Sequence, residues 1–154
     1  DGQSDLSKDF IAYIMSAEGQ TIINEHGYVG SNDAAAYEAN GAEGKLVVGG
    51  SSSVAPVMEK LIEAYKAVNP KADIELQTTD STTGMTAAID GTYDIGMASR
   101  ELKDDEAAAL SHQAIAMDGI AIIVNQANPT DELSVEQIGS IFTGDLTKWD
   151  EIVK

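Results

Sequence analysis

Apolar residues recur at helical spacing in two stretches of the chain. In the first stretch Leu6, Phe10 and Ile14 lie four residues apart, which places them on one face of a helix. In the second, residues 57–68 carry a similar apolar stripe directly after Pro56, a residue that suits the first turn of a helix. The pattern predicts a helix near the N-terminus and a longer one that begins near residue 56.

Short apolar runs predict three strands, over residues 45–48, 73–78 and 93–98. Helical patterns over residues 57–68 and 81–89 separate these strands. The order strand, helix, strand, helix, strand is typical of a parallel sheet that is covered by helices on both faces. We therefore expect an α/β fold, a three-layer sandwich with a mostly parallel sheet.

The last third of the chain continues the pattern less regularly. Residues 104–110 are rich in alanine and predict a helix, and the apolar run 114–124, broken at Asp118-Gly119, predicts a long strand. A further helix is expected over residues 134–144, followed by a last helical segment over residues 146–152.

Residues 30–44 differ in composition from the rest, because Gly, Asn, Ala and acidic residues dominate and Tyr37 is the only large apolar group. Such a stretch is typical of a linker. We expect a single domain over residues 1–154, in which this linker joins N-terminal helices (residues 1–29) to an α/β core (residues 45–154).

The charge of the chain narrows the choice of ligands. Its 154 residues include 26 Asp and Glu but only 9 Lys and Arg, a formal net charge of −17. Nucleic acids and anionic membrane surfaces are unsuitable partners, because both are bound mainly through Lys and Arg. The absence of cysteine excludes disulfides, thiolate metal sites and cysteine nucleophiles. There is no dinucleotide or P-loop motif and no metal-ligand spacing, so we expect neither a cofactor nor a metal.

Three loops rich in hydroxyl groups are associated with the predicted strands, over residues 49–53, 78–84 and 98–100. Right-handed crossovers between parallel strands bring such loops together at the carboxyl edge of the sheet. Two of the loops lead into helices, whose first N–H groups favour an anion. The loops therefore predict a site for a small oxyanion.

Two other interpretations of these serines remain open. Ser52, Ser53 and Ser81 could be ordinary helix N-caps, because serine is among the residues preferred there. A serine hydrolase is less favoured, since His26 and His112 lie in different contexts and no loop has the second glycine of a nucleophile elbow.

Several motifs after residue 45 occur together in one known family. They are Gly50-Ser51-Ser52-Ser53-Val54-Ala55-Pro56, Ser81-Thr82-Thr83-Gly84, Tyr93-Asp94-Ile95-Gly96-Met97-Ala98-Ser99-Arg100, Asp118-Gly119-Ile120-Ala121-Ile122-Ile123-Val124-Asn125, Ile141-Phe142-Thr143-Gly144 and Lys148-Trp149. Over residues 45–152 the chain thus resembles the substrate-binding proteins of ABC-type phosphate importers, the PstS-type receptors. The resemblance implies one lobe of a type II periplasmic binding protein.

The resemblance also implies which residues contact phosphate. Ser52 and Ser53 match a loop that donates through hydroxyl and backbone N–H groups. Ser81 matches a serine at a helix start, and Ser99 matches the residue that closes the third strand. The family implies a binding protein that needs no cofactor, rather than an enzyme.

The N-terminal segment resembles a different part of the same family. Residues 8–11 and 16–20 look like the closing helices of these receptors, which follow the second lobe there but precede the first strand here. The second lobe, with its arginine and its Ser-Gly-Thr turn, has no counterpart in the sequence. The resemblance suggests a first lobe alone, circularly permuted, and we favour an engineered domain over a natural rearrangement.

A single lobe is expected to bind phosphate weakly, with a Kd on the order of 1 mM or higher, because it leaves the anion half in water. The expected partners are inorganic phosphate, the missing second lobe and, in full-length relatives, the transporter permease, while the exposed interlobe surface could form a homodimer. The family implies a periplasmic or extracellular location, as a cell-surface lipoprotein in the parent proteins. Alternatives with the same fold are an effector-sensing domain and a receptor for sulfate or molybdate.

Overall fold

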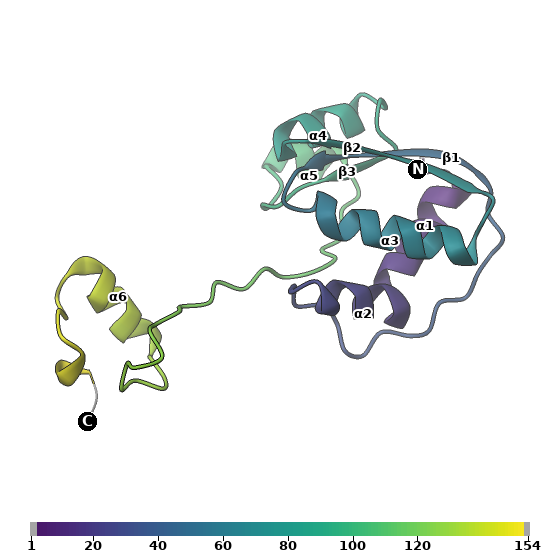
Figure 1. Ribbon diagram of the computed structural model, residues 1–154. Helices are drawn as coiled ribbons and strands as arrows, with labels where there is room; N and C mark the ends of the chain where they lie inside the picture. Colours follow the sequence, from purple (N-terminus) through teal and green to yellow (C-terminus); the bar gives the residue numbers. More distant parts are fainter. Residues whose placement is uncertain (1–2, 153–154) are drawn as a thin grey trace. The chain divides into compact units, whose positions relative to one another are not determined.

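The computed structural model describes residues 3–152 and contains two compact units, one ending at Gly119 and the other beginning at Ile120 (Figure 1). The first unit is built on a parallel sheet. Its strands, in spatial order, are β2 (Ala72–Thr79), β1 (Gly44–Ser51) and β3 (Ile95–Met97). Val48 of β1 pairs with Leu76 on one side and Ile95 on the other. The three predicted strands and their parallel arrangement are confirmed.

Helices cover both faces of this sheet. α4 and α5 lie on one face, and α1, α2 and α3 lie on the other (Figure 1). The bounds of these helices are α1 (Asp5–Met15), α2 (Ala17–Glu25), α3 (Ala55–Val68), α4 (Ser81–Ile89) and α5 (Asp104–Ala109). The expected three-layer α/β architecture is therefore present in the first unit.

The hydrophobic core of the first unit lies between β1 and the helices α1 and α3. Phe10 of α1, Leu46 of β1 and Leu61 of α3 are all fully buried. Burying a side chain of this size stabilises a fold by about 1.5–3 kcal/mol. The N-terminal helices thus supply part of the core that covers one face of the sheet.

A buried polar cluster joins α1, the linker and α3. Its members, which we call the Asp9 cluster, are Asp9, Tyr37, Tyr65 and Asn69. Both tyrosine hydroxyls donate to Oδ2 of Asp9 over 2.6 Å, and Nδ2 of Asn69 donates to the hydroxyl of Tyr65 over 3.0 Å. Asn69 also donates to the carbonyl of Ala42 over 2.8 Å. The linker is therefore fixed to the core by hydrogen bonds, although it contains no helix or strand between residues 30 and 43.

The strand predicted over residues 114–124 is absent from the structure, and this prediction was wrong. Within the described residues, only Met117 pairs with other backbone in this run, in an isolated antiparallel bridge to Val29. Ile120 is 94% exposed and Ile123 is 90% exposed. An apolar run has strand propensity, but a strand needs a neighbouring backbone to satisfy its N–H and C=O groups, and the run finds one only at Met117.

The second unit is small and has little core. It contains the helix α6 (Val135–Thr143) and the 3-10 turn η1 (Trp149–Glu151). Ser134 accepts a hydrogen bond from the N–H of Gln137 and caps α6, which confirms the helix expected from residue 134. Phe142 is 77% exposed, and none of the described residues from 120 to 152 is buried. The apolar side chains described beyond Gly119 are therefore not part of a core, and the single domain expected over residues 1–154 stays a prediction.

None of the helices within residues 3–152 is long and apolar enough to cross a membrane.

Candidate functional site

The carboxyl ends of the strands approach one another closely because two glycines meet there. Gly84 of α4 packs on Gly50 of β1, so that a Cβ atom added at Gly84 would lie 2.6 Å from the Cα of Gly50. Gly50 itself has a φ of +135°, a conformation that other residues rarely adopt. The start of α4 is thereby brought against the ends of β1 and β3.

Three serines are connected by hydrogen bonds at this junction. Oγ of Ser51 donates to Oγ of Ser99 over 2.9 Å, and the N–H of Ser99 donates to Oγ of Ser81 over 3.2 Å. The hydroxyl oxygens of Ser81 and Ser99 are 3.4 Å apart. Ser51 is 3% exposed, whereas Ser99 is exposed and Ser81 is half-buried. The structure therefore brings Ser81 and Ser99 together and places Ser51 beneath them.

Ser52 and Ser53 lie on the neighbouring turn between β1 and α3, and both are exposed. The N–H of Ser52 donates to the carbonyl of Thr79 over 3.1 Å, so that this N–H is already occupied. The carbonyl of Ser53 accepts a hydrogen bond of 2.8 Å from the hydroxyl of Tyr28. In the part of the chain that is described, no hydrogen bond connects the side chain of either serine to Ser81 or Ser99.

The alternative interpretation of the serines as helix N-caps was wrong. The N-cap of α3 is Val54, which has no side-chain cap, and Pro lies in the first turn. The N-cap of α4 is Asp80, whose Oδ1 accepts from the N–H groups of Thr82 and Thr83 over 2.9 and 3.0 Å. Hydrogen bonds from Thr83 hold the pKa of Asp80 below its ordinary value, which favours the charged cap. Because Asp80 serves the helix, the hydroxyl of Ser81 is not needed for capping.

An ion pair lies beside the serines. The guanidinium of Arg100 donates from Nη1 and Nη2 to the two carboxylate oxygens of Glu106 over 2.7 and 2.8 Å. Nη2 also lies 3.4 Å from the hydroxyl oxygen of Thr82 in α4. Glu106 is only 5% exposed, and its hydrogen bonds from Arg100 and from the N–H of Lys103 lower its pKa to about 2. The pair therefore stays charged over the ordinary pH range.

The pKa of Glu106 predicts an acid-dependent loss of stability. The ordinary pKa of 4.5 returns on unfolding, so the unfolded chain binds the proton more readily than the folded chain between pH 4.5 and about 2. The stabilisation by this carboxylate is complete above pH 4.5 and is lost as the pH falls to about 2. Thermal unfolding of the wild type and of Glu106→Gln should give a difference in Tm that is largest near neutral pH and vanishes at the acid limit. A difference that does not change with pH would contradict this expectation.

The histidines take no part in the serine cluster. Nδ1 of His26 lies 2.7 Å from the carbonyl oxygen of Ile22, within its own segment, and His112 is exposed. Among residues 3–152, no group of three or more His, Asp or Glu side chains is arranged to hold a metal ion.

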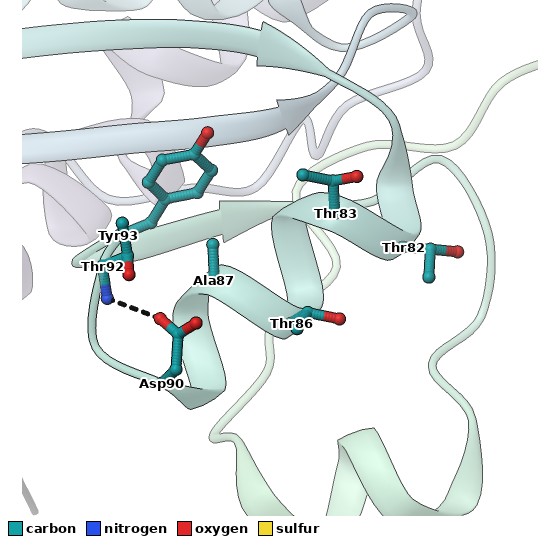
Figure 2. Close-up of a pocket in the computed structure, with 7 residues that line it drawn as sticks. All are labelled: Thr82, Thr83, Thr86, Ala87, Asp90, Thr92 and Tyr93. Atoms are coloured by element: carbon teal, nitrogen blue, oxygen red, sulfur yellow. Dashed lines mark hydrogen bonds between the residues drawn. The ribbon is translucent and has the colours of Figure 1, made fainter.

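An open hollow of about 410 Å³ lies along α4 and the loop that follows it (Figure 2). It is lined by Thr82, Thr83, Thr86, Ala87, Asp90, Thr92 and Tyr93. The N–H of Thr92 donates to Asp90 over 2.9 Å at its rim. None of the four predicted serines lines this hollow, so we place the candidate site at the serines and not here.

Sequence reasoning missed three residues that shape the candidate site. Ser51 and Arg100 belong to the motifs noted above but were assigned no role, and Tyr28 lies in a segment that is distant in sequence. The only available signal was the clustering of serines in residues 49–53, which does not show which serine ends the strand and which ones lie on the turn.

The sequence and the fold both match known proteins. A family described as a PBP superfamily domain matches residues 35–153. Phosphate-binding protein PstS 2 of Streptococcus agalactiae serotype V is 49% identical over 153 residues, which cover 99% of this chain and 52% of that protein. The crystal structure of a phosphate-binding protein of a phosphate ABC transporter from Streptococcus pneumoniae TIGR4 superposes with a TM-score of 0.82 at 42% identity, covering 97% of this chain and 59% of that one.

A further match is a phosphate ABC transporter substrate-binding protein from Clostridium perfringens, whose crystal structure contains bound phosphate. It has a TM-score of 0.53 at 43% identity and covers 70% of this chain and 45% of that one. The parallel α/β fold of the first unit is that of one lobe of a periplasmic binding protein. The chain belongs to the PBP superfamily, and it is similar to PstS phosphate-binding proteins, as its motifs suggest.

The chain spans about half the length of the curated relatives it matches. The match to the S. agalactiae protein includes 99% of the chain, so the order of N-terminal helices followed by the α/β core is shared with that relative. An engineered origin is therefore not required to explain this order. Circular permutation relative to other members of the family stays a prediction.

Proposed function

We propose that this chain binds inorganic phosphate at the carboxyl edge of its sheet, as one lobe of the solute receptor of an ABC importer. The observation that carries the proposal is the junction of Ser81 and Ser99 at the start of α4, where neither hydroxyl serves as a helix cap. Asp80 already accepts from the N–H groups of Thr82 and Thr83 at the start of this nine-residue helix, so the donors that the junction offers to an anion are the serine hydroxyls. The names of the relatives, which are phosphate-binding proteins, support phosphate as that anion.

In this proposal each serine has a defined role. Ser81 and Ser99 donate hydrogen bonds from their hydroxyl groups to phosphate oxygens, while the hydroxyl of Ser51 donates to that of Ser99. Ser52 donates through its hydroxyl, because its N–H is bound to Thr79. Ser53 contributes its hydroxyl from a turn that Tyr28 holds in place. The site needs no metal or cofactor for this binding.

We infer that the lobe alone binds phosphate weakly, with a Kd on the order of 1 mM or higher. Four hydroxyl donors at an exposed edge compete with water, and each net hydrogen bond contributes only about 0.5–1.5 kcal/mol. A second lobe that closes over the anion would exclude this water and add donors. The proposal therefore includes a second lobe as the natural partner of this one.

The wider setting of the proposal follows from the family. The receptor would deliver phosphate to the permease of the transporter, outside the cytoplasmic membrane, and it would act by binding and not by catalysis. The relatives that match do not favour any of the alternatives, which were sulfate or molybdate transport, effector sensing and hydrolysis. Whether exposed apolar side chains lead to a homodimer can be measured by light scattering over a range of protein concentrations.

Phosphate titration of the isotopically labelled chain, followed by NMR, tests the proposed function. We expect saturable shifts of the amides at Ser53, Ser81 and Ser99. The double variant Ser81→Ala and Ser99→Ala should raise the Kd by at least about fivefold, because the two lost hydrogen bonds together contribute about 1–3 kcal/mol. The exposed Ser111 provides a control, and its replacement by alanine should leave the Kd unchanged. Equal binding by the double variant would refute the site, and absence of shifts in the wild type would refute the function.

A further inference from the structure

Arg100 connects the loop that carries Ser99 to two other elements. Its Nη1 and Nη2 atoms bind the two oxygens of Glu106 in α5 over 2.7 and 2.8 Å. Nη1 also donates to the carbonyl of Glu101 over 2.9 Å, and Nη2 lies 3.4 Å from Oγ1 of Thr82 in α4. The guanidinium thus lies between the loop after β3, the start of α4 and the start of α5.

Glu106 is a fixed anchor for this guanidinium. Its side chain is 5% exposed, and Oε2 accepts a hydrogen bond of 2.9 Å from the N–H of Lys103, at the start of α5. A carboxylate that is held by its own helix can hold both arms of a bidentate arginine in one orientation. The planar guanidinium of Arg100 therefore fixes the loop after β3 relative to α5.

The guanidinium is not arranged as a direct ligand for an anion. Both Nη atoms already make two contacts each with protein oxygens, and the positive charge is paired with Glu106. The residues beside Arg100, one in sequence and one in space, indicate a different role. Arg100 follows Ser99 directly, and its contact Thr82 follows Ser81 directly. The arginine therefore connects the same two segments that the hydrogen bond between Ser99 and Ser81 joins.

We propose that Arg100, anchored by Glu106, is a positioning residue that holds Ser99 against Ser81 in the anion site. This inference rests on the proposed phosphate site for its effect on binding. The contact of the two serines can also be measured without phosphate.

Two substitutions separate positioning from simple electrostatics. Glu106→Gln removes a negative charge near the site, so electrostatics alone would tighten phosphate binding, whereas loss of the anchor would weaken it. Arg100→Lys keeps the positive charge but loses the bidentate fork. We expect both variants to raise the phosphate Kd by at least about threefold. The matched control is Glu63→Gln, which makes the same charge change in the exposed pair with Lys60 on α3 and should not weaken binding.

A second measurement tests the positioning role in the absence of phosphate. The N–H of Ser99 donates to Oγ of Ser81, so its exchange with solvent reports directly on the contact of the two serines. Exchange should be several-fold faster in Glu106→Gln and Arg100→Lys, and unchanged in Glu63→Gln. Unchanged exchange, or phosphate binding as tight as in the wild type, would overturn the proposal. If the wild type binds no phosphate, the proposed function fails, and the exchange rates still decide the positioning role.

Discussion

Replacing Asp9 by alanine is expected to lower the free energy of unfolding of the first unit by about 2–4 kcal/mol. The carboxylate is buried and accepts 2.6 Å hydrogen bonds from both Tyr37 and Tyr65. Its removal leaves two hydroxyl donors without an acceptor, that of Tyr65 buried and that of Tyr37 half-buried, and a buried unpaired donor costs about 1–3 kcal/mol. The loss is a large part of the 5–15 kcal/mol that is typical of a domain. Thermal unfolding followed by circular dichroism should show a fall in Tm of roughly 5–15 °C.

Two variants on the same helix control this experiment. Asp9→Asn retains an acceptor oxygen and should recover part of the lost stability. Asp5→Ala removes an exposed carboxylate in the first turn of α1 and should cost at most about 1 kcal/mol. A result in which Asp5→Ala and Asp9→Ala are equally destabilising would show that the Asp9 cluster does not hold the N-terminal helices.

Alkaline unfolding provides a second check on the Asp9 cluster. Burial, followed by the hydrogen bond to Asp9, raises the pKa of Tyr65 from 10.0 to about 12. The folded chain keeps this proton between pH 10 and about 12 while the unfolded chain releases it, so stability falls as the pH rises through this range. In Asp9→Ala the contribution of the carboxylate is gone, and the ionisation of Tyr65, followed by ultraviolet absorbance, should move to lower pH.

Local patterns predicted the elements of the first unit because they depend on nearby residues. The four-residue spacing of Leu6, Phe10 and Ile14 is sufficient to define the buried face of α1. The parallel order of the strands then placed the loops at one edge, and this is why the contact between Ser81 and Ser99 is consistent with the predicted site.

The remaining features depend on partners that no local pattern reveals. The run 114–124 has the composition of a strand, but its backbone pairs only at Met117. Ser51 and Ser99 are 48 residues apart in sequence, and their hydrogen bond depends on the pairing of β1 with β3. The roles of Arg100 and Glu106 depend on the orientation of α5, which its alanine-rich sequence does not specify.

The net charge of −17 does not conflict with an anion site. At physiological ionic strength, charges beyond about 8–10 Å are largely screened, so the groups that touch the anion decide its binding. Two acidic residues beside the serines are already engaged, since Asp80 caps α4 and Glu106 pairs with Arg100. The proposed site therefore presents hydroxyl donors within an acidic surface.

The same glycine-to-alanine change is expected to have opposite effects in two helices. In Gly84→Ala the new Cβ would lie 2.6 Å from the Cα of Gly50 and 3.0 Å from the carbonyl oxygens of Gly49 and Met97. These neighbours are backbone atoms of the sheet and cannot move aside as a flexible side chain does. The gain in helix propensity of up to about 1 kcal/mol is smaller than the strain, and we expect a net loss of about 1–3 kcal/mol. The start of α4 would also be pushed away from β3.

Gly139 of α6 is the matched control, because a Cβ added there meets no atom within 4 Å. Gly139→Ala should therefore stabilise α6 by about 0.5–1 kcal/mol, measured as slower amide exchange in that helix. In Gly84→Ala the exchange of the Ser99 amide should become faster and phosphate binding should weaken, since α4 carries Ser81. If both substitutions stabilised their helices, the close contact of Gly84 with Gly50 would not determine the geometry of the site. Opposite signs, with faster exchange of the Ser99 amide in Gly84→Ala, would show that this backbone contact helps to position the serines beside the ion pair of Arg100 and Glu106.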